Sequence, residues 1–188
     1  MKKIKTIIIA VVLVTSLIFS GCSGDKVATE DTLDGSLKDI MTSIIDGAAE
    51  SLSEEDVFPD FFDMQSSASD ALFNLGLNED EFTEYVEDNL INVAMLAVIP
   101  CELVLVKCKD IADGPKVAEM MKKGYDPQKW IETMPEVSYI IGSGSYILLF
   151  SGTAGQQEAV EKSFKDLAGG NTFLGEVFFT EDDAKPIE

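Results

Sequence analysis

One apolar stretch in the middle of the chain constrains the fold more than any other feature. Residues 93–108 read VAMLAVIPCELVLVKC, a nearly continuous apolar run that is interrupted by Pro100 and Glu102. Such a run predicts a straight or bent strand before Pro100 and a central strand over residues 102–107. The folded domain is therefore expected to be built around a sheet.

Three further strands are expected towards the C-terminus. Residues 137–141 and 146–150 flank the sequence GSGS, which has the length and the residue types of a hairpin turn. A phosphate-binding loop would need a strand-to-helix context and more widely spaced glycines, so the hairpin is the preferred interpretation. The stretch TFLGEVFFT, which begins at Thr172, predicts an edge strand.

Helices are predicted before and between these strands. Apolar residues at three- and four-residue spacing indicate a helix over residues 36–50. A short helix over residues 68–74 is expected to stop at Gly76, and an amphipathic helix is expected over residues 115–123. Asp126 is expected to cap a further helical piece.

Asn78 and Thr153 are each followed three residues later by Glu or Gln, the spacing of a capping box, and predict helices over residues 78–90 and 153–167. The order of elements indicates the α+β class. We expect a mostly antiparallel sheet of about four to five strands with helices packed on one face, a two-layer sandwich. Residues 34–188 are expected to form this single domain.

The N-terminal segment has the organisation of an export signal. Three lysines lie within the first five residues, and an apolar run over residues 7–19 is followed by Ser, Gly and Cys22. A membrane-spanning helix needs about 18 to 20 apolar residues, and this run is shorter. Cleavage after residue 21 is therefore expected, in preference to a retained anchor helix.

The sequence IFSGC at the end of this leader resembles a lipobox, with Phe19 in the place of the common leucine. The resemblance implies that Cys22 carries a lipid and becomes the first residue of the mature chain. Residues 22–33 would then be the lipidated cysteine and a polar tether. The expected location is the outer face of the cytoplasmic membrane, with ordinary secretion as an alternative.

The charge of the chain excludes one class of partner. Removing the leader removes three of the 14 basic residues and none of the 34 acidic residues, which changes the net charge from −20 to −23. Nucleic-acid binding depends on Lys and Arg that neutralise phosphates, so no nucleic acid is expected as a partner. Direct docking on anionic lipid head groups is disfavoured for the same reason.

Catalytic and metal-binding motifs are absent from the sequence. The chain has no histidine, which excludes a Ser-His-Asp triad and removes the commonest metal ligand. The acidic cluster at residues 78–81 lacks the alternating ligands and central glycine of a calcium loop. On one straight strand, Cys101 and Cys108 would point to opposite faces, so both are expected to fill the core. No catalytic residue, metal or cofactor is predicted.

Four aromatic side chains are the candidates for contact with a ligand or a partner. Phe58, Phe61 and Phe62 lie in the segment SLSEEDVFPDFFDM, where they could form an exposed patch. Trp130 is the single tryptophan and could stack on a ring. The alternative interpretation is that the phenylalanines cover the edge of the core and that the indole is a lid on it.

The stretch EFTEYVEDNLINVAMLAVIPCELVLVKCKD, followed by DPQKW and VSYIIGSGSYILLFS, resembles a family of lipoproteins from Gram-positive, largely gut-dwelling anaerobes that is known only as a domain of unknown function. The resemblance runs from about residue 33 to residue 167. It implies a lipoprotein address and an α+β fold, and it implies no catalytic residues.

Three functions are compatible with this sequence. The preferred hypothesis is a non-enzymatic, membrane-anchored module that binds a protein, a cell-wall polymer or a small ligand. An alternative is a hydrolase of glycans or wall polymer that uses paired carboxylates, because such an enzyme needs no histidine. A third is a structural role beside a membrane complex, in which the acidic surface meets a basic partner.

Overall fold

The computed structural model describes residues 30–184, apart from residue 55 and residues 131–132. Its elements confirm the predicted α+β class. In chain order they are α1 (Leu37–Ala49), β1 (Phe61–Met64), η1 (Ala68–Asp70), α2 (Ala71–Leu75), α3 (Glu79–Tyr85), β2 (Val86–Ala94), β3 (Glu102–Cys108), η2 (Ile111–Asp113), α4 (Gly114–Gly124), β4 (Val137–Ser143), β5 (Tyr146–Gly152), α5 (Ala154–Leu167), β6 (Phe173–Thr180) and η3 (Glu181–Asp183), where η denotes a 3-10 helix.

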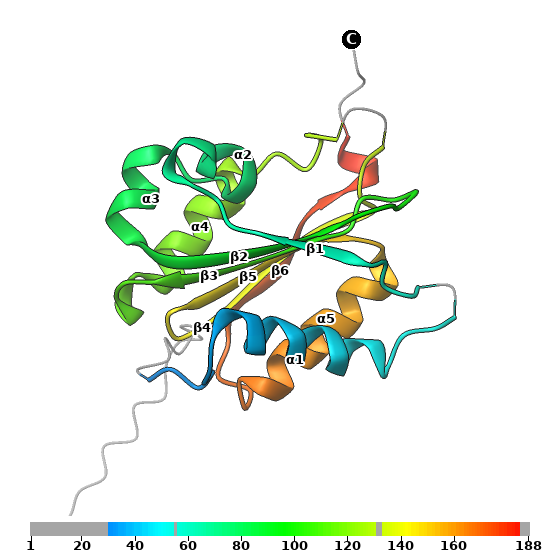
Figure 1. Ribbon diagram of the computed structural model, residues 1–188, viewed down its shortest axis with the longest axis horizontal. Helices are drawn as coiled ribbons and strands as arrows, with labels where there is room; N and C mark the ends of the chain where they lie inside the picture. The colour runs from blue at the N-terminus through cyan, green and yellow to red at the C-terminus, as the bar shows by residue number, and fades with distance from the viewer. Residues whose placement is uncertain (1–29, 55, 131–132, 185–188) are drawn as a thin grey trace, which may run out of the picture.

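The described strands form one antiparallel sheet in the order β1-β2-β3-β5-β4-β6 (Figure 1). Strand β3 lies between β2 and β5, which confirms the predicted central strand. The sheet has six strands in the described residues. The additional strand is β1, which the aromatic segment after Pro59 forms at one edge by pairing with β2.

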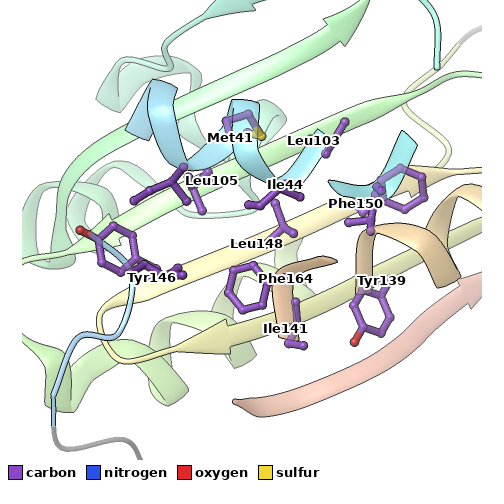
Figure 2. Close-up of a cluster of buried hydrophobic side chains, with 14 of the residues drawn as sticks. Met41, Ile44, Leu103, Leu105, Tyr139, Ile141, Tyr146, Leu148, Phe150 and Phe164 are labelled. Carbon is purple, nitrogen blue, oxygen red and sulfur yellow. The ribbon is translucent and has the colours of Figure 1, made fainter. Parts of the chain in front are cut away.

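Helices cover both faces of this sheet, so the predicted two-layer arrangement is corrected to three layers (Figure 1). Helices α1 and α5 pack on one face, where Met41, Ile44 and Phe164 lie against the strands (Figure 2). Helices α2 and α4 pack on the other face. In β3, Leu103 belongs to the first of these cores and Val104 to the second. A strand that is apolar on both sides needs a layer of helices on each side.

The predicted capping boxes are confirmed. Asn78 Oδ1 accepts a hydrogen bond from the Glu81 amide at 3.0 Å, and Thr153 Oγ1 accepts one from the Gln156 amide at 3.1 Å. Helix α3 nevertheless ends at Tyr85 rather than near residue 90, because the following residues pair with β3 as strand β2. Tertiary pairing here overrides the local preference for helix.

The two ends of the sheet are built differently. At one end, which we call the hairpin end, Gly144 and Ser145 connect β4 to β5 in a tight turn. The described chain begins beside this turn, where the Asp31 carboxylate accepts a hydrogen bond from the Ser145 amide at 2.7 Å. At the opposite end, which we call the loop end, longer connections join β2 to β3 through residues 95–101 and α4 to β4 through residues 125–136 (Figure 1).

Candidate functional site

The candidate site lies at the loop end, on the face of the sheet that α4 covers. There the strand register places Phe62, Val93, Glu102, Ser151 and Ser138 side by side across five strands. Directly paired residues of neighbouring strands point to the same face of a sheet. An apolar half of this row, on β1 and β2, therefore adjoins a polar half on β3, β5 and β4.

The polar half of the row is a buried hydrogen-bond network. Tyr125 Oη donates to Glu102 Oε2 at 2.6 Å and lies 3.0 Å from Ser151 Oγ. Ser151 Oγ lies 2.8 Å from Ser138 Oγ. Burial, followed by the negative charge of Glu102, holds the pKa of the Tyr125 hydroxyl well above its usual value. Tyr125 therefore stays protonated and acts as a donor to the carboxylate.

Lys129 neutralises the carboxylate in this network. Its Nζ lies 2.9 Å from Glu102 Oε2, and both side chains are only 2% exposed. The ammonium also donates to the Phe73 carbonyl at 3.2 Å and lies 4.5 to 5.2 Å from the ring centroids of Tyr125, Phe73 and Trp130. Cation–π contacts stabilise a desolvated ammonium. The pair fixes residues 125–130 over the end of the sheet.

Two glycines set the position of this segment. Gly76 ends α2 with a φ of +74°, and a side chain there would lie 2.3 Å from the Tyr125 nitrogen. A side chain at Gly124, the last residue of α4, would lie 2.0 Å from the Gly76 carbonyl oxygen. The backbones of α2 and α4 therefore touch where the segment begins. After Asp126 the chain forms a turn rather than the predicted helical piece.

A pocket of about 240 Å³ adjoins the apolar half of the row. Most of the residues that line it have apolar or aromatic side chains: Val93, Ala94, Met95, Leu96, Ala97, Pro100, Cys101, Trp130 and Thr133. Trp130 Nε1 is buried, and no described residue accepts a hydrogen bond from it. These side chains can contact an apolar side chain or a small apolar group of a ligand.

The connection between β2 and β3 exposes apolar side chains beside the pocket. Leu96 is 90% exposed and Val98 is 87% exposed, and Met95 is also exposed. On the neighbouring edge strand, Phe62 is 59% exposed and pairs with Val93, which lines the pocket. We call Phe62, Met95, Leu96, Val98 and Trp130 the apolar surface of the loop end. Exposed apolar groups that gather at one place are typical of interaction surfaces, which makes this surface a candidate.

The structure separates the four aromatic candidates into two pairs. Phe58 and Phe61 pack against the core under α1 and α5, with ring centroids 5.9 Å apart. Phe62 follows Phe61 in the same strand and therefore points to the opposite face. Phe62 and Trp130 both belong to the loop end. The proposed lipid site, Cys22, lies outside the described residues.

Several thiols and carboxyl groups have shifted pKa values. Cys101 and Cys108 are free and buried on opposite faces of the sheet, as predicted, and burial raises the pKa of each thiol to about 12. Hydrogen bonds from Ser36 and Lys38 lower the pKa values of Asp39 and Asp63, respectively. A carboxyl general acid requires a raised pKa. The lowered pKa values of Asp39 and Asp63 are the opposite of that shift.

A second concave surface, of about 640 Å³, lies between α4 and β6 and is lined by Lys116, Glu119, Met120, Lys122, Lys123 and Phe178. Two of its lysines are engaged within the protein. Lys122 pairs with Glu119 at 2.8 Å and with Glu176 at 2.5 Å, and Lys116 donates to the Tyr85 hydroxyl. This surface is more open than the Trp130 pocket, and two of its three lysines are engaged within the protein, which makes the loop end the better candidate.

Sequence reasoning singled out Phe62 and Trp130, which both lie at the loop end, but missed the ion pair between Glu102 and Lys129. The available signal was Glu102 itself, an acid at the start of a strand that is otherwise apolar. A buried carboxylate requires a partner. The identity of that partner depends on a contact across 27 residues of sequence, which only the fold determines.

Comparison of the chain with protein-family models, with curated proteins and with solved structures finds no match in any of the three. Among the described residues, no helix is long and apolar enough to cross a membrane.

Proposed function

We propose that the protein is an exported lipoprotein that binds a partner through its loop end while Cys22 anchors it at the outer face of the cytoplasmic membrane. The leader and the IFSGC sequence support the address. One structural observation carries the binding function. The exposed Leu96 and Val98 and the Trp130 pocket lie at the end of the sheet opposite to the turn where the described chain begins. An anchored domain would present this end away from its attachment.

The apolar surface also supports binding because folding does not need it. Leu96 and Val98 lie outside both hydrophobic cores. Exposed apolar side chains favour association with a partner, because the contact removes their surface from water. A non-enzymatic module that binds a protein or wall polymer fits these features, whereas no observation favours the hydrolase alternative.

Photo-cross-linking on intact cells tests this function. A photoreactive amino acid would replace Leu96 at the loop end or, as the control, Leu167, which is 40% exposed at the end of α5. We expect a cross-linked product from position 96 and none from position 167. Products from neither position, or from both equally, would contradict binding through the loop end. Release of a Cys22→Ala variant from the membrane would test the address separately.

A further inference from the structure

The charges around the apolar surface indicate what its partner carries. The loop end is made by residues 52–60, 94–102, 126–137, 151–155 and 179–184. In the described parts of these segments Lys129 is the single basic side chain, and it is buried against Glu102. The exposed charges that remain at this end, in the described residues, are carboxylates: Glu54, Asp60, Asp126, Glu181, Asp182 and Asp183.

Backbone hydrogen bonds join the segments that carry Asp60 and residues 181–183 to the connections that hold the apolar surface. The Asp60 carbonyl accepts a hydrogen bond from the Met95 amide at 2.9 Å, which ties the acidic loop before β1 to the apolar loop after β2. Residues 181–183 form a 3-10 helix, and the Glu181 amide donates to the Glu136 carbonyl at 2.9 Å. Asp183 Oδ2 caps this turn by accepting from the Thr180 amide at 3.0 Å.

From this arrangement we infer that the partner of the loop end is a protein segment that combines Lys or Arg with apolar side chains. The inference rests on the proposed function, because it names the chemistry of the partner for the same surface. An apolar side chain would enter the Trp130 pocket or cover Leu96 and Val98, while basic side chains would meet the carboxylates of the rim. Complementary charges at the rim of an apolar contact speed association and exclude partners of the wrong charge.

The same charges disfavour three other occupants. A polyanionic wall polymer would place its phosphates beside unpaired carboxylates, and this repulsion is unfavourable. A second copy of this acidic surface would be repelled for the same reason. Membrane lipid is disfavoured because anionic head groups repel the rim. A basic segment of another protein remains as the occupant that satisfies both the charge and the apolar surface.

Binding of short peptides to the full-length chain in phosphatidylcholine vesicles tests this inference. The probe is a fluorescent peptide that carries both Lys and Leu side chains. One comparison peptide has Glu in place of Lys, and another has Ser in place of Leu. Empty vesicles provide the background for each peptide. We expect measurable binding of the Lys-Leu peptide alone, with an affinity that falls as the salt concentration rises.

Two variants and one matched control locate the contact. Leu96→Ser with Val98→Ser should weaken binding of the Lys-Leu peptide by about tenfold or more, because the apolar contact is lost. Glu181→Gln with Asp182→Asn should weaken it by about fivefold, since two screened pairs are lost. The control removes two exposed carboxylates elsewhere, by Asp34→Asn and Glu84→Gln, and should change the affinity by less than about twofold.

Each other outcome overturns the inference in a recognisable way. Equal binding of the Glu-Leu peptide would show an apolar contact with no preference for cations, which would leave the proposed function intact. Equal binding of the Lys-Ser peptide, or an equal effect of the control variant, would show unspecific attraction to an acidic protein. If no peptide binds while position 96 still cross-links on cells, the partner has other chemistry. The absence of any cross-link is instead the failure of the proposed function.

Discussion

The hairpin end and the loop end of the sheet use the same strands for different purposes. At the hairpin end, Gly144 and Ser145 turn the chain within two residues, and Asp31 satisfies the amide and the hydroxyl of Ser145. At the loop end the connections are longer, Leu96 and Val98 are exposed, and a charged pair is buried. The hairpin end contains what folding requires, whereas the loop end contains features that folding alone does not explain.

The buried pair is the clearest of these features. A buried ion pair is a weak source of stability, because desolvation of both charges offsets their attraction. The pair between Glu102 and Lys129 is therefore better explained by what it positions, which is the turn that carries Trp130 beside the pocket. The difference between the ends should be measurable, because substitutions at the loop end can be matched by similar substitutions at the hairpin end.

The largest effect is expected when one member of the buried pair is removed. Lys129→Met leaves the Glu102 carboxylate buried without its counterion, which should lower the free energy of unfolding by roughly 3 to 5 kcal/mol. The counterpart is Lys107→Met at the hairpin end, where the partly exposed pair with Glu87 should contribute less than about 1 kcal/mol. Urea denaturation of both variants compares them. Equal losses of unfolding free energy would mean that the ion pairs at the two ends contribute equally to stability.

A matching substitution of both partners sharpens this result. Glu102→Leu combined with Lys129→Met removes both charges, and the double variant should recover most of the stability that Lys129→Met loses. Partner binding should nevertheless stay weakened if the ion pair positions Trp130. Full binding by the double variant would show that the pair has no positioning role.

A smaller effect is expected from the glycine contact that supports the loop end. Gly76→Ala should destabilise the fold by about 3 kcal/mol, from the strain of a positive φ and from the clash with the backbone around Tyr125. Gly170 is the control, because its φ is +77° but no atom lies within 4 Å of an added side chain. Gly170→Ala should cost roughly 1 kcal/mol. Thermal unfolding that shifts equally for both variants would argue against the contact.

The two buried thiols, one near each end of the sheet, should both reduce the stability of the fold at high pH. Burial raises the pKa of Cys101 and of Cys108 from 9.0 to about 12, so the folded state keeps each thiol protonated. The stability from this effect is complete below about pH 9 and is lost as the pH rises towards 12. Urea denaturation measures the free energy of unfolding at about pH 8 and at about pH 10.5. Between these two pH values it should fall less for Cys101→Ala, and less for Cys108→Ala, than for the natural chain. If the free energy of unfolding falls as much in a variant as in the natural chain, the burial of that thiol is contradicted.

Sequence reasoning predicted the framework better than the site. The central strand, the hairpin and the caps at Asn78 and Thr153 follow from local patterns, which is why they were found. The second helical layer was missed although the apolar run of β3 already indicated a strand that is buried on both faces. The network around Lys129 could not be found, because it joins residues that only the fold of the sheet brings together.

The most direct test of the binding claim measures stability and partner capture on the same variants. Leu96→Ser with Val98→Ser should change the free energy of unfolding by less than about 0.5 kcal/mol, because both side chains are exposed. It should abolish capture of the cell-surface partner through a cross-linker at position 95, whereas Leu167→Ser should leave capture unchanged. Capture that survives the loss of Leu96 and Val98, in a variant that is as stable as the natural chain, would contradict binding through the loop end.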